Sequence, residues 1–219
     1  MGFQTTAPAS SATYFTLSDG KCRIRLKEPT SESVSRVTKD GDTVHELIYD
    51  QFTGIIRDIA ISETDYGMQW RITFLEAPTF YVCTLKYWSN YAKTIIQALC
   101  NPSWDASLET TVKPYSFNPK DDASRLITGT TVLQRGQKIE RPYCSPLNPV
   151  DGKITLPELE KVKIRGVEQW DDTKQMDFLV SEFKEKVLTK IQKPAMFMPS
   201  NTPSQHQPLQ EDDNGALPF

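Results

Sequence analysis

Alternating cations near the N-terminus form the first candidate site for chemistry. In one short segment four cations alternate with three apolar residues: Lys21, Cys22, Arg23, Ile24, Arg25, Leu26 and Lys27. Successive side chains of a strand point to opposite faces, so a strand here carries the cations on one face and the apolar groups on the other. Such a face suits contact with nucleic-acid phosphates, which lysine and arginine bind without reading sequence. The alternative is an ordinary solvated strand face.

Aromatic side chains beside cations form a second candidate site, because the bases of a single strand stack on exposed aromatic rings. One cluster follows Lys86, and Tyr66 lies in a turn between two expected strands. In the alternative interpretation the aromatics belong to the core, as we expect for Trp70 and Phe74, whereas Trp88 and Tyr66 are expected to be exposed. The complete predicted DNA-binding set is Lys21, Arg23, Arg25, Lys27, Tyr66, Arg71, Lys86, Tyr87, Trp88 and Tyr91.

The end of the chain carries a third pattern. Three carboxylates, Glu211, Asp212 and Asp213, precede an apolar plug of Leu217, Pro218 and Phe219, behind a stretch rich in Pro, Ser, Asn, Gln and Thr. A partner protein can bind such a tip with a pocket for the ring, a basic residue for the terminal carboxylate, and cations around the acids. The alternative is a solvated tail that happens to stop there.

Catalytic and metal-binding patterns are weak. The chain has two histidines, and its four cysteines (Cys22, Cys83, Cys100 and Cys144) form no C-x-x-C pair. We therefore expect reduced structural cysteines, no zinc site and no cofactor. The segment 129–138 is superficially similar to a phosphate-binding loop, but its Lys follows Gln and no Ser or Thr comes after it. We expect no enzymatic activity.

Composition favours a globular protein without a membrane segment. The 219 residues carry a net charge of −3, and the three acids of the tail leave the body with equal numbers of acidic and basic residues. Any nucleic-acid binding must therefore use a local basic surface. No apolar run approaches the about 18 residues of a membrane helix. The polar N-terminus does not resemble a signal peptide, which predicts a cytoplasmic location.

The elements expected to position these residues are mostly strands. Periodicity and turn residues predict strands within 14–26 and at 43–49, 55–62, 68–75, 79–87, 108–117, 126–133 and 138–143. Helical spacing predicts a helix over 89–100, capped by Ser89, and a second over 172–192. We predict a mainly β (α+β) fold: an OB-like β-barrel with one inserted helix, a C-terminal helix and a disordered C-terminal tail. The expected divisions are a disordered arm (1–13), an OB-like domain (14–150), a Pro-rich connection with the helix (151–193) and a linker with the acidic tip (194–219).

Two resemblances narrow the functional expectation. The tip resembles that of bacterial single-stranded DNA-binding proteins, although Asn-Gly-Ala-Leu here separates the acids from Pro-Phe. Residues 14–145 resemble proteins of tailed phages that infect gut Bacteroides, including crAss-like phages, which are usually taken to bind single-stranded DNA. That resemblance implies an OB-like barrel and a phage replication role. It rests on Tyr14 to Lys21, Arg23, Lys27 to Thr30, Asp65 to Gly67, Gln69-Trp70 and Ser89 to Ala92.

We therefore expect a sequence-tolerant single-stranded DNA-binding protein that acts in phage DNA replication, recombination and repair in the host cytoplasm. Its tip is expected to recruit host or phage replication and repair proteins, and a homo-oligomer is left open. Two alternatives remain: an adaptor without DNA affinity that mimics the host tip, and a virion structural protein. Salt-dependent retention on single-stranded DNA separates the first interpretation from both alternatives.

Overall fold

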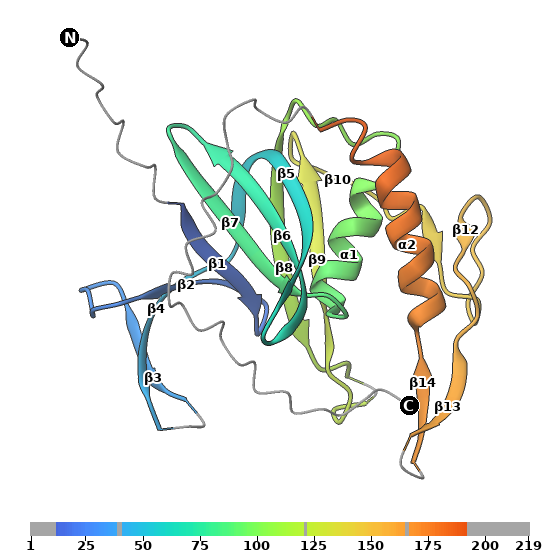
Figure 1. Ribbon diagram of the computed structural model, residues 1–219, viewed down its shortest axis with the longest axis horizontal. Helices are drawn as coiled ribbons and strands as arrows, with labels where there is room; N and C mark the ends of the chain where they lie inside the picture. The colour runs from blue at the N-terminus through green and yellow to red at the C-terminus, as the bar shows by residue number, and fades with distance from the viewer. Residues whose placement is uncertain (1–11, 39–40, 121, 165–166, 192–219) are drawn as a thin grey trace.

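The structure is a computed structural model that describes residues 12–38, 41–120, 122–164 and 167–191 (Figure 1). Most strands belong to one sheet, with the order β10-β9-β8-β5-β6-β7-β1-β2-β4-β3. Their bounds are β1 Thr13–Ser18, β2 Lys21–Leu26, β3 Val34–Val37, β4 Thr43–Tyr49, β5 Phe52–Thr64, β6 Gly67–Glu76, β7 Thr79–Lys86, β8 Glu109–Phe117, β9 Ile127–Gln134 and β10 Gln137–Lys138. Two small sheets pair β11 (Tyr143–Cys144) with β12 (Ile154–Thr155) and β13 (Glu160–Ile164) with β14 (Val167–Asp171).

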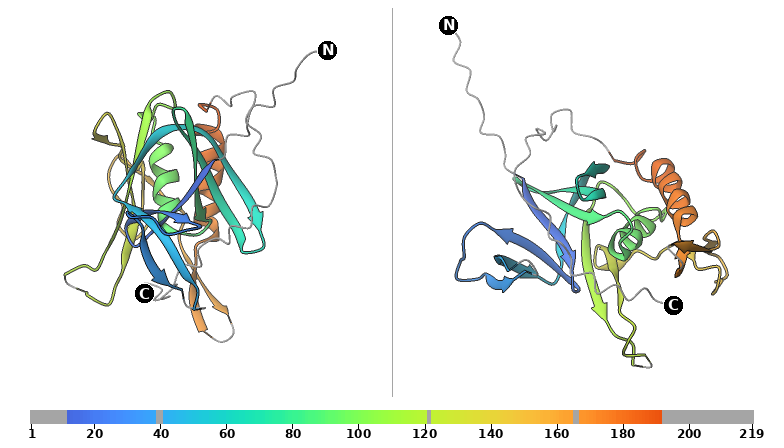
Figure 2. Two further views of the ribbon diagram at one scale, coloured as in Figure 1. Left: turned by 90° about the vertical axis from the view of Figure 1, so that its left-hand side faces the viewer. Right: turned by 60° about the horizontal axis from the view of Figure 1, so that its bottom comes forward.

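The prediction of a mainly β fold is confirmed, but the described strands do not close into a barrel. The sheet ends at two edges, β10 and β3, and β3 and β4 bend away from the other strands (Figures 1 and 2). Helix α1 (Asn90–Leu99) lies along the part of β9 that β10 leaves open. There the backbone N–H of Thr130 donates to Thr94 Oγ1 at 2.8 Å, a bond that a neighbouring strand would otherwise accept.

Both helices cover one face of the sheet and form the core with it. In α1 the apolar positions Tyr91, Ile95, Ile96 and Leu99 are buried, and Ser89 caps the helix by accepting from the N–H of Ala92. Helix α2 (Thr173–Lys186) buries its stripe against α1 and the sheet, where Phe183 meets the ring of Trp70 edge-on at 5.1 Å. Both predicted helices are confirmed. The second ends at Lys186, earlier than predicted, although Val187 and Ile191 beyond it are still buried.

Several strand predictions need correction. Residues 14–26 form two strands joined at Asp19 and Gly20, whose φ values of 49° and 71° make a tight hairpin turn. The predicted strand over 138–143 is interrupted, since Pro142 cannot donate a ladder hydrogen bond. Strands β3 and β12–β14 were not predicted, because they are short or lack a continuous apolar face, and β11 shares only Tyr143 with the predicted strand.

Parts of the prediction lie outside the described residues. These are most of the arm at 1–13 and the whole linker and tip at 194–219. In the described part of the chain, no helix is both long enough and apolar enough to cross a membrane.

Candidate nucleic-acid interface

The sheet face opposite the core brings distant cations into one row. Arg23 on β2 pairs with Thr16 on β1, whose hydroxyl donates to the carbonyl of Thr84 on β7 at 3.0 Å. Thr84 in turn pairs with Arg71 on β6. Two arginines therefore flank two small threonines across four strands, on the face that points away from the buried Leu17. The row gathers predicted contacts that lie far apart in the sequence.

A second row lies nearer the β1–β2 turn. Lys21 pairs with Ser18 of β1, and Lys86 pairs with Gln69 of β6, on the same face as Arg71. The exposed Arg25 extends the face in the opposite direction along β2. Lys27 follows the last residue of β2, so the predicted four-cation strand contains three cations. The fourth is exposed on the connection to β3.

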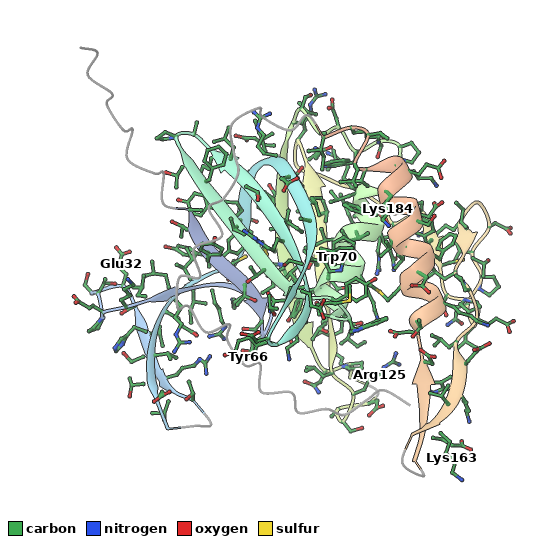
Figure 3. All side chains as sticks on the ribbon, in the orientation of Figure 1. Glu32, Tyr66, Trp70, Arg125, Lys163 and Lys184 are labelled. Carbon is green, nitrogen blue, oxygen red and sulfur yellow. The ribbon has the colours of Figure 1, made fainter. Side chains whose placement is uncertain are left out.

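Two of the predicted aromatics are exposed at the end of this face. Trp88, 45% exposed, follows β7, and Tyr66, 55% exposed, lies in the β5–β6 turn (Figure 3). A hydrogen bond of 3.1 Å from the N–H of Tyr87 to the carbonyl of Met68 keeps the chain before Trp88 beside β6. The predicted exposure of both rings is confirmed, and both are available for stacking.

Tyr87 and Tyr91 are buried, so the prediction that bases stack on them is wrong for this structure. Tyr87 lies parallel to the ring of Trp70, with centroids 5.7 Å apart, and burial raises its pKa. The hydroxyl of Tyr91 accepts from the N–H of Gly20 at 3.0 Å and ties α1 to the β1–β2 turn. Trp70 and Phe74 are core residues, as predicted. Tyr87, just after β7, and Tyr91, in α1, point inward and pack in the core.

Arg23, expected to contact phosphate, instead forms ion pairs with two carboxylates of the protein. Its guanidinium donates to Glu46 Oε2 at 2.8 Å and to Asp19 Oδ2 at 2.9 Å, and the Arg23 side chain is only 14% exposed. Glu46 on β4 is 1% exposed and also accepts from Arg36 of β3 at 3.1 Å. We call these four residues the Glu46 network. The structure thus corrects the expectation that Arg23 is an outward phosphate contact, because a buried carboxylate holds it.

The ion-pair partner of Lys21 is easier to replace than that of Arg23. It forms an exposed ion pair with Asp50 at 2.5 Å, and its hydrogen bond lowers the pKa of that carboxyl. Exposed pairs of this kind contribute little to stability. A phosphate can therefore replace Asp50 at Lys21, whereas at Arg23 it would have to compete with a buried partner.

The remaining candidate chemistry is structural. All four cysteines are free and buried, and burial raises the pKa of Cys22 to about 12 and that of Cys100 to about 11. A hollow of about 90 Å³ between α1, β9 and β10 includes Thr130, Lys138 and Arg141 in its lining. That is well below the roughly 300 Å³ of a typical small-molecule site. No group of three or more metal-ligating residues occurs in the described ranges.

The buried acid Glu46 and the small residues Thr16 and Thr84 of this surface were not predicted from the sequence. Glu46 and Arg36 come close to Arg23 only because β2, β4 and β3 pair, and the spacing of residues in the sequence does not predict this pairing. Thr16 and Thr84 carried a weaker signal, since both alternate with buried apolar residues of their strands. The predicted tip residues Glu211, Asp212, Asp213, Leu217, Pro218 and Phe219 lie outside the described part.

Comparison of the chain with protein-family models, with curated proteins and with solved structures finds no match. The assignment of a function therefore depends on the chemistry of the surface.

Proposed function

We propose that this chain is a sequence-tolerant single-stranded DNA-binding protein that acts in phage DNA replication, recombination and repair. The observation that carries the proposal is the outer sheet face, where Lys21, Arg25, Arg71 and Lys86 surround a floor of small side chains. A floor of threonine and serine lets a backbone approach closely, and the surrounding cations neutralise its phosphates. In this proposal the curved sheet takes the role of the OB-like barrel.

The exposed aromatics favour single strands over duplex as the ligand. Trp88 and Tyr66 stand at the end of the basic face, where bases of an unpaired strand can stack on them. Bases in a duplex are already stacked on one another and offer no free face. Contacts to phosphates and to ring faces carry little sequence information, so binding is expected to tolerate any sequence.

Titration of labelled single- and double-stranded oligonucleotides over a range of salt concentrations tests the proposal. The full chain is expected to prefer single strands, and Arg71→Glu and Lys86→Glu are each expected to weaken binding for every sequence. Each lost phosphate contact should reduce the slope of log K against log salt by about 0.7. Lys184→Glu on α2 makes the same change of charge away from this face, and Figure 3 shows Lys184 on α2, apart from Tyr66.

Equal affinity for duplex, or variants indistinguishable from the Lys184→Glu control, would refute the proposed interface. No retention on single strands at low salt would instead favour the adaptor or virion alternatives.

The C-terminal tip completes the proposal as a site for replication and repair proteins. Its carboxylates repel phosphates, so the plug and the DNA-binding face have separate roles. Deleting Leu217, Pro218 and Phe219 is expected to abolish capture of host replication proteins and to leave DNA affinity nearly unchanged. If the shortened chain still captured the same partners, the partner-binding site would lie in the body of the protein and not in the tip.

A further inference from the structure

The hairpin β13–β14 projects from the body beside the start of α2 (Figure 1). Its two strands pair Lys161 with Trp170 and Lys163 with Glu168, so these four side chains share one face. A two-stranded hairpin buries little on its own and is marginally stable in isolation. Since the exposed side chains of β13–β14 contribute little to a core, we consider what they could bind.

Trp170 gives that face an aromatic surface. The ring is 44% exposed, whereas Trp70 and Trp104 are buried. The ammonium group of Lys161 lies 5.1 Å from the ring centroid, where a cation interacts favourably with the π system. A large ring left in water beside a cation matches the platforms on which bases of single strands stack.

Two of the three charged side chains on the face that carries the ring are cations. Lys161 and Lys163 are both exposed and lie two residues apart, which is about 6.8 Å along a strand. Glu168 is the acid on this face, and its ion pair with Lys161 is long, 3.6 Å, and exposed on both sides. Such a pair is weak, so phosphate can replace the carboxylate at Lys161.

Packing joins the hairpin to α2, on the helix-covered side of the sheet, and a series of ring contacts leads from α2 to Trp88 at the end of the basic face. Lys174 of α2 forms an ion pair with Glu160, and Asp171 accepts from the N–H of Thr173 at 2.9 Å, so the hairpin base is joined to the start of α2. Further along α2, Phe183 contacts Trp70, and the ring of Trp70 lies against Tyr87. Tyr87 in turn meets the exposed ring of Trp88 edge-on at 4.8 Å.

We propose that β13–β14 is a second contact for single-stranded nucleic acid, where a base stacks on Trp170 while Lys161 and Lys163 contact adjacent phosphates. The proposal rests on the proposed function and extends the bound segment beyond the sheet face. A protein partner is less favoured, because the exposed ring is flanked by two flexible cations instead of further apolar surface.

Oligothymidylates of increasing length test the second contact in the full chain. Lengths should extend below and above the about 4–16 nucleotides that one such surface occupies. Trp170→Ala is expected to leave the affinity for the shortest strands unchanged and to weaken the longest by about 5- to 160-fold. Trp170→Phe keeps a ring and should restore most of the loss. Lys163→Glu should also weaken only long strands, and Lys184→Glu is its matched control.

The outcomes separate the two proposals. If the wild-type chain binds single strands and Trp170→Ala binds every length equally well, the second contact is refuted and the sheet face stands. Weakening of all lengths alike by Trp170→Ala would also refute it, since the ring would then belong to the first contact. If the wild-type chain binds no oligothymidylate, the proposed function fails, and the hairpin proposal fails with it. Thermal unfolding of each variant checks that these exposed substitutions leave the fold intact.

Discussion

Replacing Arg23 by Ala is expected to destabilise the fold more than it weakens DNA binding. The change removes the bond of 2.8 Å to Glu46 and leaves that carboxylate, 1% exposed, with Arg36. It also removes the bond to Asp19, which is exposed and contributes little. The dominant effect is a buried charge that has lost one of its two partners.

The magnitude follows from these contacts. Removing one partner of a buried ion pair costs roughly 3–5 kcal/mol when the other charge is left alone. Because Arg36 still donates to Glu46, we expect the lower end, about 3 kcal/mol. For a chain of this size about 1 kcal/mol lowers the melting temperature by about 2–4 °C, so a decrease of about 6–12 °C is expected.

Urea and thermal unfolding of Arg23→Ala, Glu46→Gln and the control variant Lys184→Ala provide the measurement. Lys184 is an exposed cation on α2 away from Glu46, so Lys184→Ala is expected to change stability by less than about 1 kcal/mol. The double variant Arg23→Ala/Glu46→Gln should lose less than the sum of the single variants, since the two side chains interact directly. A coupling energy near zero would contradict the Glu46 network. A stable Arg23→Ala variant that has lost DNA affinity would show that Arg23 is a phosphate contact after all.

Four further expectations test other parts of the structure. Gly20→Ala places a Cβ 2.7 Å from the backbone N of Ser116 at a φ of +71°. In urea unfolding it should therefore cost more stability than Gly67→Ala, whose Cβ has no neighbour within 4 Å. Equal losses from the two substitutions would show that the close approach of Gly20 to Ser116 does not matter. The buried thiols should react slowly with a thiol reagent at neutral pH, and rapid reaction of all four without denaturant would contradict their burial. Because the folded pKa values of Cys22 (about 12) and Cys100 (about 11) exceed the unfolded value of about 8.5, their contribution to stability is complete below that pH and is lost as the pH rises through 11–12, which melting curves can follow. Trp88→Ala should weaken single-strand binding by roughly 1–3 kcal/mol with an unchanged melting temperature, and unfolding instead would show that the ring supports the core.

Local patterns in the sequence were sufficient for both helices, for the long strands and for part of the site. The capped helix at Asn90–Leu99 follows from Ser89 and the helical spacing of its apolar residues, and the strands β5 to β9 follow from their alternation and turns. The exposure of Tyr66 and Trp88 was also predictable, since both lie where strands end. These features depend on interactions between residues that are close in the chain.

Tertiary structure alone decided which cations remain available and how the sheet is arranged. Arg23, Arg25 and Lys21 are equivalent in the sequence pattern, yet the fold gives Arg23 an ion pair with the buried Glu46, whose register partner is Arg25, and gives Lys21 one with the exposed Asp50. Tyr87 is adjacent to Trp88 but turns inward onto Trp70. Which residues meet across strands depends on a register set by the whole core, and a shift of one residue would reverse every side chain. For the same reason, no local pattern indicated that Arg71 would lie in one row with the cations of β2 or that Trp170 would stand exposed beside Lys161.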